Sequence, residues 1–358
     1  MTPSSDHEDH GFAGALRLPE PLAPDPSTAP GLRWGVISPG HIADQFAATA
    51  HRATESRIVA VASRSQGRAQ EFATKHGAAG AFDSVEAMLD AGGIDAVYVA
   101  SPHAQHHQYA RAVLQADLPV VVEKAFTLNA AQAEDLFQLA VQRQLFVMEA
   151  MWARFLPQYD VLRQVLDSGL LGEIIEVTAE HGQYFEKDPQ HRLYAPELGG
   201  GALLDLGVYP ISFAQMVVGD LTDPAIQGDQ AFTGVDAYVG LLSRGARGGR
   251  ARVATTLQAR MRNEAVVTGT DGSAHLTRPF YAPGTLTVTL RDGSSGRFEH
   301  SGPSGDGMAY EIAEAARRIT AGDLESPSMS WEDTLSVMRT MDAARTALGI
   351  TYPGEEQA

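Results

Sequence analysis

In the segment Leu32-Arg33-Trp34-Gly35-Val36-Ile37-Ser38-Pro39-Gly40-His41-Ile42-Ala43 an apolar run ends in a turn and a helix begins, and this junction indicates the type of fold. Residues 32–37 have the pattern of a buried strand, and residues 41–50 have that of a helix. The turn places small residues at Ser38, Gly40 and Ala43, where the dinucleotide-binding fingerprint needs a tight turn, room for a pyrophosphate and close helix packing. Ser38 stands where the fingerprint usually has a glycine, so an ordinary strand-to-helix turn is the alternative.

The alternation of strand and helix continues to about residue 151. Apolar runs predict further strands at residues 57–62, 95–100, 120–123 and 145–149, with helices between them. Several runs are apolar on both faces, which is typical of a parallel sheet covered by helices on each side. Residues 31–151 are therefore predicted to form a doubly wound α/β domain of the Rossmann type.

The end of the second predicted strand indicates which dinucleotide binds. Enzymes that use NAD often have Asp or Glu there to bind the ribose hydroxyls. This chain has Ser63 and Arg64 instead, followed by Arg68. A hydroxyl and a guanidinium can bind the 2′-phosphate that a carboxylate would repel. We therefore predict NADP rather than NAD, with a solvated, non-functional Arg64 as the alternative.

The pattern changes after residue 151. From residue 231 to about residue 299 strand follows strand, with turn signals at residues 245–249, 271–272 and 292–293. This predicts an α+β domain over residues 152–358, built on a large, mainly antiparallel open sheet. Two helices close the chain at residues 308–321 and 331–348, and Ser330 with Asp333 forms a capping box for the second.

The composition excludes several classes of protein. The 358 residues carry a formal net charge of −17 and no basic run, whereas a nucleic-acid binder needs positive charge to track phosphates. The absence of cysteine excludes disulfides and thiol catalysis. No apolar stretch approaches the length expected of a membrane span. We expect a soluble globular protein with no nucleic-acid or membrane partner.

Residues 1–30 are rich in proline and acidic residues and have no periodic apolar pattern, so we predict a disordered tail. They lack the features of a secretory signal, and a cytoplasmic location is the default expectation. The cluster Asp6-His7-Glu8-Asp9-His10 has metal-ligating side chains, but in an unstructured tail we interpret it as solvated charge. His106 and His107 lack an acidic partner at a helical interval, so we predict no metal site.

Glu123-Lys124 ends the apolar run Val120-Val121-Val122, where a predicted strand gives way to a loop. Burying an ammonium is costly unless its charge is needed. Ligands of parallel sheets bind at this edge. Lys124 is therefore a candidate catalytic residue, and a surface lysine after an edge strand is the alternative.

A second polar group lies in the segment Leu198-Gly199-Gly200-Gly201-Ala202-Leu203-Leu204-Asp205-Leu206-Gly207-Val208-Tyr209-Pro210. Three glycines at a helix entrance allow close backbone approach. Asp205 and Tyr209 are four residues apart and share one face of an otherwise apolar helix. A core tyrosine with a satisfied hydroxyl is the alternative, and the aspartate on the same face favours a functional site.

Taken together, these segments resemble the Gfo/Idh/MocA family of oxidoreductases. The resemblance covers nearly everything after residue 31 and includes the run Met148-Glu149-Ala150-Met151-Trp152-Ala153-Arg154-Phe155. The chain is most similar to the branch with dimeric dihydrodiol dehydrogenases, NADP-dependent D-xylose dehydrogenases and glucose–fructose oxidoreductase. Two residues depart from the commoner pattern: Ala125 replaces a proline after Lys124, and Tyr209 replaces a histidine, as it does in that branch.

The resemblance implies a Rossmann domain followed by an open antiparallel sheet whose free face commonly pairs in a homodimer or homotetramer. It also implies that the last helix, at residues 331–348, returns to the first domain. We expect the cofactor to contact the following residues: Ser38, Pro39, Gly40, His41, Ile42, Ser63, Arg64, Arg68, Ser101, Pro102, His103, His106, Glu123 and Lys124.

For catalysis we predict that Tyr209 is the general base in alcohol oxidation and the acid in the reverse direction. Free tyrosine has a pKa near 10, and a lysine ammonium in a dry cleft can lower it. That is the role expected of Lys124, with Asp205 orienting the lysine or the substrate. His103 is an alternative base. The substrate pocket is expected to include Trp152, Arg154, Phe155 and Arg192, with a surface role as the alternative for Arg192.

The function predicted from these residues is an NADP-dependent dehydrogenase acting on a hydroxyl of an aldose or a cyclic vicinal diol. A second hypothesis is an oxidoreductase that retains its nucleotide and cycles between two sugars. A third, of another class, is a sensor that binds nucleotide and sugar without turnover. Retention of Lys124, Asp205 and Tyr209 together argues against the sensor.

Overall fold

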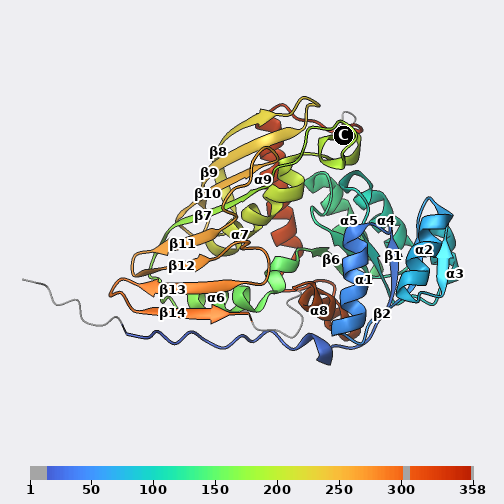
Figure 1. The fold of residues 1–358 in the computed structure, drawn as a ribbon, viewed down its shortest axis with the longest axis horizontal. Coiled ribbons are helices and arrows are strands. Elements are labelled where there is room, and N and C mark those ends of the chain that lie inside the picture. The colour runs from blue at the N-terminus through green and yellow to red at the C-terminus, as the bar shows by residue number, and fades with distance from the viewer. Residues whose placement is uncertain (1–13, 301–306, 356–358) are drawn as a thin grey trace, which may run out of the picture.

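The computed structural model describes residues 14–300 and 307–355, which form two β-sheets with helices around and between them (Figure 1). The amino-terminal sheet and its helices lie on the right in Figure 1, and the larger carboxyl-terminal sheet lies on the left. The prediction of a Rossmann sheet followed by a large, mainly antiparallel sheet is confirmed.

The first sheet is parallel, with the strand order β3-β2-β1-β4-β5-β6 in the described part of the chain. Its strands are β1 (Arg33–Ile37), β2 (Arg57–Ala62), β3 (Gly80–Phe82), β4 (Ala96–Val99), β5 (Val120–Glu123) and β6 (Val147–Ala150). Its helices are α1 (His41–Ala53), α2 (Gln66–His76), α3 (Val85–Ala91), α4 (His106–Gln115) and α5 (Ala130–Arg143). The order reverses between β1 and β4, and such a switch point opens a crevice at the carboxyl ends of the strands.

The second sheet has the order β14-β13-β12-β11-β7-β10-β9-β8 over the described residues. Neighbouring strands are antiparallel except β7 and β10, which are parallel. The strands are β7 (Ile174–Gly182), β8 (Leu221–Gln230), β9 (Asp236–Gly245), β10 (Arg250–Thr256), β11 (Ala265–Gly269), β12 (Gly272–Leu276), β13 (Thr285–Leu290) and β14 (Ser295–Glu299). Buried and more exposed residues alternate along β7 and β10, so one face of the sheet packs on helices.

Three helices pack on this second sheet: α6 (Pro157–Asp167), α7 (Val208–Val218) and α9 (Trp331–Ala347). The segment Pro196–Val218, which ends in α7, is long and apolar enough to cross a membrane. The expectation that no stretch approaches that length was therefore wrong. The whole apolar window is buried inside the protein, as in the core helix of a soluble protein.

Helix α9 joins the two halves of the molecule, because it packs on α7 and on α5. Trp331 stacks on Phe137 of α5 with the ring centroids 5.1 Å apart, and its indole Nε1 donates to the carbonyl of Val147, at 2.9 Å. Near the other end, Arg345 donates to the carbonyl of Leu128, at 2.9 Å. The capping box of Ser330 and Asp333 is present at the start of α9.

The prediction of a disordered tail over residues 1–30 was wrong for residues 14–30, while residues 1–13 lie outside the described residues. In Figure 1 this segment runs along the lower edge of the molecule, from β14 to α8 (Met308–Ala321). The amide of Leu16 donates to the carbonyl of Ser295, and Arg317 of α8 donates to the carbonyl of Asp25, at 2.7 Å. Leu18 is buried against the protein core. A proline-rich segment with few apolar residues is ordered here because the folded protein provides its partners.

Candidate functional site

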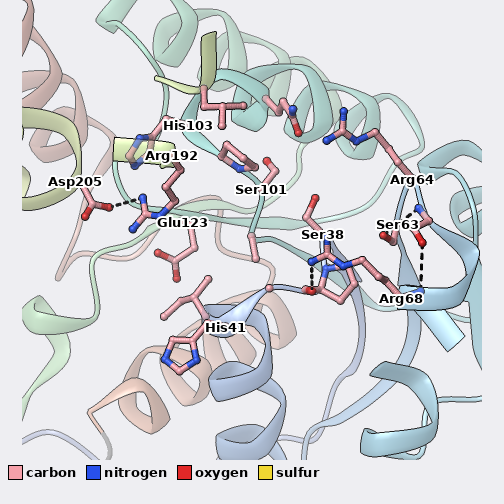
Figure 2. A pocket seen from close by; sticks show the side chains of 18 of the residues that line it. Ser38, His41, Ser63, Arg64, Arg68, Ser101, His103, Glu123, Arg192 and Asp205 are labelled. Atoms are coloured by element: carbon pink, nitrogen blue, oxygen red, sulfur yellow. Dashed lines mark hydrogen bonds and ion pairs between the residues drawn. The ribbon is translucent and has the colours of Figure 1, made fainter. Parts of the chain in front are cut away.

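A pocket of about 810 Å³ opens at the carboxyl edge of the parallel sheet, within the range usual for ligand sites. Figure 2 shows Asp205, Arg192 and Glu123 toward one end of it and Ser63, Arg64 and Arg68 at the other. The lining residues are Ser38, Pro39, Gly40, His41, Ile42, Ser63, Arg64, Ser65, Arg68, Ala100, Ser101, Pro102, His103, Gln105, Glu123, Lys124, Arg192, Leu198 and Asp205.

The turn between β1 and α1 forms one wall of the pocket. Gly40 is the N-cap of α1 and provides no side-chain cap, so the first amides of the helix are open to a ligand. A Cβ built on Gly40 would have no atom within 4 Å, which leaves the space beside this backbone open. Ser38 has a φ of 69°, a left-handed conformation that supports a tight turn. This geometry suits a phosphate at a helix N-terminus.

Ser63 and Arg64 follow β2 and line the same pocket. Arg68, on α2, donates from Nη2 to the carbonyl of Pro39 at 3.1 Å and so ties α2 to the turn before α1. Among the described residues that line the pocket, the carboxylates are Glu123 and Asp205, which lie away from these two arginines. Arg64 and Arg68 therefore put two guanidiniums at this end of the pocket, and Asp83 and Glu86 line a neighbouring cavity that shares Ser63 and Arg64.

Lys124 and Asp205 meet at the inner end of the pocket, although 81 residues separate them. The Lys124 ammonium donates to the backbone carbonyl of Asp205 at 2.8 Å and lies 3.4 Å from its Oδ1. Arg192 donates to the same Oδ1 at 2.9 Å. Asp205 sits in a π-helical turn, Leu203–Gly207, that precedes α7, and such turns are frequent at functional sites.

Lys124 and Arg192 keep the side chain of Asp205 ionised. Burial raises the pKa of this carboxyl, but the Lys124 ammonium and the Arg192 guanidinium outweigh burial and hold the pKa well below its usual range. Asp205 is therefore a carboxylate at any physiological pH. A buried charge of this kind is stable only while its partners remain in place.

Tyr209 lies beside this ion pair but does not line the pocket of Figure 2. Its hydroxyl accepts a hydrogen bond from Trp152 Nε1 at 2.8 Å, and the Lys124 ammonium lies over its ring, 5.1 Å from the centroid. Burial raises the pKa of Tyr209 well above 10, and the Glu123 carboxylate raises it further. The expected lowering of this pKa is therefore not seen, because burial and the Glu123 carboxylate raise it.

Glu123 and His103 complete this end of the pocket. Tyr98 donates its hydroxyl to Glu123, and the amide of Lys124 donates to the other carboxylate oxygen at 3.2 Å. His103 Nδ1 lies 2.8 Å from the carbonyl of Gly199. Burial lowers the pKa of His103 to about 3, so its imidazole is neutral. The peptide bond between Lys124 and Ala125 is cis.

His106 was predicted to contact the cofactor, but it is fully buried and does not line the pocket. Its Nδ1 lies 2.9 Å from the carbonyl of Ala125, and its Nε2 lies 2.7 Å from that of Ser101. The ring thus connects the loop after β4 with the loop that carries Lys124. Ser101 and Pro102 do line the pocket, and Ser101 Oγ is buried with no hydrogen-bond partner among the described residues.

Of the four residues predicted for the substrate, Arg192 lines the pocket and Trp152 contacts Tyr209. Arg154 and Phe155 do not line the pocket, contrary to the prediction. Arg154 is buried, pairs with Asp333 at 3.2 Å and donates to the carbonyl of Ser212. Phe155 lines a different cavity, beneath the amino-terminal segment. Both follow β6 in a 3-10 turn that directs them away from the pocket.

Several residues of the site gave no signal in the sequence. Tyr281 stacks on Tyr209 with centroids 4.7 Å apart, and His181 packs on Tyr281 at 4.3 Å. Gln183 lies 3.0 Å from His181 Nε2 and 3.5 Å from the hydroxyl of Tyr281. The end of β7 and the loop after β12 bring these side chains to Tyr209, and neither segment has a recognisable motif.

No group of three or more His, Cys, Asp or Glu side chains within the described ranges could hold a metal ion. The acidic and histidine cluster at residues 6–10 lies outside those ranges.

Burial lowers the pKa of His106 to about 4, so its ring should stay neutral between pH 5 and 8. The unfolded chain takes up a proton near pH 6.5, and the folded chain does not. The stabilisation from neutral His106 is therefore complete above about pH 6.5 and declines as the pH falls towards 4. Ring NMR shifts should stay constant from pH 8 to 5, and the stability advantage over His106→Gln should shrink below pH 6.5. A ring that titrates between pH 6 and 7 would contradict this assignment.

Comparison with known families agrees with the fold and the pocket. Residues 32–151 match the oxidoreductase family with an NAD-binding Rossmann fold, GFO_IDH_MocA, and residues 159–275 match the GFO/IDH/MocA C-terminal domain. The chain is thus an NAD(P)-dependent oxidoreductase by family, with a nucleotide cofactor and a small-molecule substrate.

Individual relatives support the same assignment. The chain is 32% identical to a trans-1,2-dihydrobenzene-1,2-diol dehydrogenase from Xenopus tropicalis, over 90% of this chain and 99% of that protein. It is also 32% identical to the D-xylose 1-dehydrogenase (NADP(+)) of Hypocrea jecorina, over 90% of this chain and 93% of that protein. A solved 3-ketoreductase from Actinomadura kijaniata in complex with NADP superposes with a TM-score of 0.76 and 29% identity, covering 88% of this chain and 98% of its own. This chain belongs to the Gfo/Idh/MocA family of oxidoreductases.

Proposed function

We propose that the protein is an NADP-dependent oxidoreductase that interconverts a hydroxyl and a carbonyl on an aldose or a cyclic vicinal diol. The observation that carries the proposal is the Lys124–Asp205 pair, fixed beside Tyr209 at the inner end of a pocket whose outer end presents Arg64. The relatives act on the same kinds of group, namely a dihydrodiol, D-xylose and a 3-keto group.

The residues present fit a dinucleotide. The uncapped start of α1 and the open space at Gly40 suit the pyrophosphate, and Ser63 with Arg64 suits a 2′-phosphate. The buried, unpartnered Ser101 Oγ on the pocket wall is a free polar group that a ligand can satisfy. Bound NADP supplies the acceptor or donor of hydride, at C4 of its nicotinamide.

Tyr209 is the residue suited to transfer the proton of the substrate hydroxyl. A phenol whose pKa is raised by burial keeps its proton at neutral pH, so Tyr209 is suited to donate it to the oxygen of a carbonyl that is being reduced. Trp152 fixes the phenol oxygen from one side, which leaves its proton free to point elsewhere. In the oxidation direction the phenol oxygen must first lose its own proton, and it then receives the proton of the substrate hydroxyl.

Lys124 supplies a positive charge beside that proton transfer. Its contacts with the carbonyl and Oδ1 of Asp205 fix the ammonium in place. An ammonium in a site that excludes water stabilises the negative charge that develops on a substrate oxygen. Tyr281 stacks on Tyr209 and fixes the plane of the phenol ring beside the ammonium.

The direct test is turnover across a panel of D-xylose, D-glucose, anhydrosugars, inositols and trans-dihydrodiols, each with NADP and with NAD. We expect NADPH formation with at least one aldose or diol and much weaker turnover with NAD. Turnover with none of them, together with tight binding of NADP, would instead support a sensor. A bound nucleotide that resists dialysis would favour a cycle between two sugars.

Replacing Arg64 with Ala should raise the KM for NADP about ten- to a hundredfold, as expected for loss of a charge-assisted hydrogen bond to a phosphate. The KM for NAD should change less than about twofold, since NAD has no 2′-phosphate. Arg33→Ala is a matched control. Arg33 is the first residue of β1 and pairs with Asp95, so it lies at the amino ends of the parallel strands, away from the pocket at their carboxyl ends. Equal changes in both KM values would remove the assignment of Arg64.

Replacing Tyr209 with Phe should lower kcat by about a hundredfold or more, the usual effect of losing a general acid or base. NADP affinity, measured by quenching of protein fluorescence, should stay close to that of the native protein. Tyr159→Phe is the control, since Tyr159 is also buried but packs on Phe213 in the core. If Tyr209→Phe turns over within a few-fold of the native rate, the proton donor is another group.

A further inference from the structure

The described end of the chain folds back onto the site. After α9 the chain turns, with the amide of Ile350 donating to the carbonyl of Arg345 at 2.9 Å. Tyr352 is then buried, and its hydroxyl donates to the carbonyl of Gly200 at 2.5 Å. This contact spans 152 residues of sequence and reaches the glycine loop, residues 199–201.

Glu355 fastens this end of the chain to both halves of the molecule. Its carboxylate accepts from Arg345 of α9 at 2.7 Å, from Asn129 at 2.8 Å and from the amide of Tyr352 at 2.8 Å. Asn129 is the N-cap of α5, in the nucleotide-binding half. The Arg345 guanidinium also lies over the ring of Tyr352, 4.8 Å from its centroid. Residues 350–355 therefore form a strap with both ends fixed.

The glycine loop that the strap reaches is held closely on its other sides. The carbonyl of Gly199 contacts His103 Nδ1, which lines the pocket. A Cβ on Gly200 would lie 2.8 Å from the carbonyl oxygen of Leu193, and one on Gly201 would lie 2.2 Å from Oδ1 of Asp236. The amide of Leu203 donates to Asp236 Oδ2 at 2.5 Å. Small displacements at Gly200 must therefore move its neighbours.

The loop leads directly into the π-helical turn that carries Asp205. Asp205 holds the Lys124 ammonium through its backbone carbonyl as well as its side chain, so the position of this backbone sets the position of the ammonium. We propose that the strap sets the geometry of the catalytic ion pair, with Tyr352 as a positioning residue that acts through Gly200. For turnover, this inference rests on the proposed function.

Tyr352→Phe removes only the hydroxyl and tests the strap without changing its packing. We expect faster hydrogen exchange in peptides that cover residues 199–205 and a kcat lowered about two- to tenfold, the range for loss of one hydrogen bond. NADP affinity should change less than about twofold, because Arg64 and Arg68 lie at the opposite end of the pocket from Asp205. Glu355→Gln, which weakens the fastening to Arg345 and Asn129, should shift exchange and kcat in the same direction.

Tyr159→Phe serves as the control, because it removes a buried hydroxyl elsewhere, and it should leave exchange over residues 199–205 at the native rate. A lower melting temperature for Tyr352→Phe with native exchange in the loop and native kcat would overturn the proposal, since the strap would then be only structural. Hydrogen exchange needs no substrate. If the substrate panel fails, exchange still decides whether the strap holds the loop, so the two proposals fail separately.

Discussion

The contact between Lys124 and Asp205 is the interaction on which the rest of the site depends. It joins the end of β5, in the nucleotide-binding half, to the turn before α7, in the other half. Both side chains are largely withdrawn from water, and a buried charge is tolerated only when it is paired and hydrogen-bonded. The two halves must therefore pack in one arrangement to satisfy these charges, and that arrangement defines the pocket between them.

The charges around this contact are balanced and separated from the rest of the pocket. Lys124 and Arg192 face Asp205, while Glu123 is held by Tyr98 and by the amide of Lys124. At the opposite end of the pocket, Arg64 and Arg68 have no carboxylate beside them among the described lining residues. Tyr209 stays a neutral phenol because burial and the Glu123 carboxylate raise its pKa. The same geometry thus separates a phosphate-binding end from an end suited to proton transfer.

Much of the fold followed from local pattern, and the errors have identifiable causes. The turn at Ser38–Gly40, the N-cap Asn129 and the capping box of Ser330 and Asp333 are local signals, and the structure contains each of them. His106, Arg154 and Phe155 lie beside true site residues in sequence, but 3-10 and helical turns direct their side chains into the interior. Residues 14–30 adopt a defined conformation because they form hydrogen bonds with β14, α6 and α8. All three elements lie more than a hundred residues away in the sequence.

Local sequence pattern predicted the alternation of strand and helix, the nucleotide turn, and the candidates Lys124, Asp205 and Tyr209, because periodicity, turn chemistry and unusually placed polar residues are properties of neighbouring residues. Three contacts came from packing alone: Lys124 with the backbone of Asp205, Tyr281 with Tyr209, and Tyr352 with Gly200. Packing also raises the pKa of Tyr209 through burial, whereas the sequence led us to expect a lowered pKa. These features depend on distances between segments far apart in the chain, and such distances are set by packing rather than by local pattern.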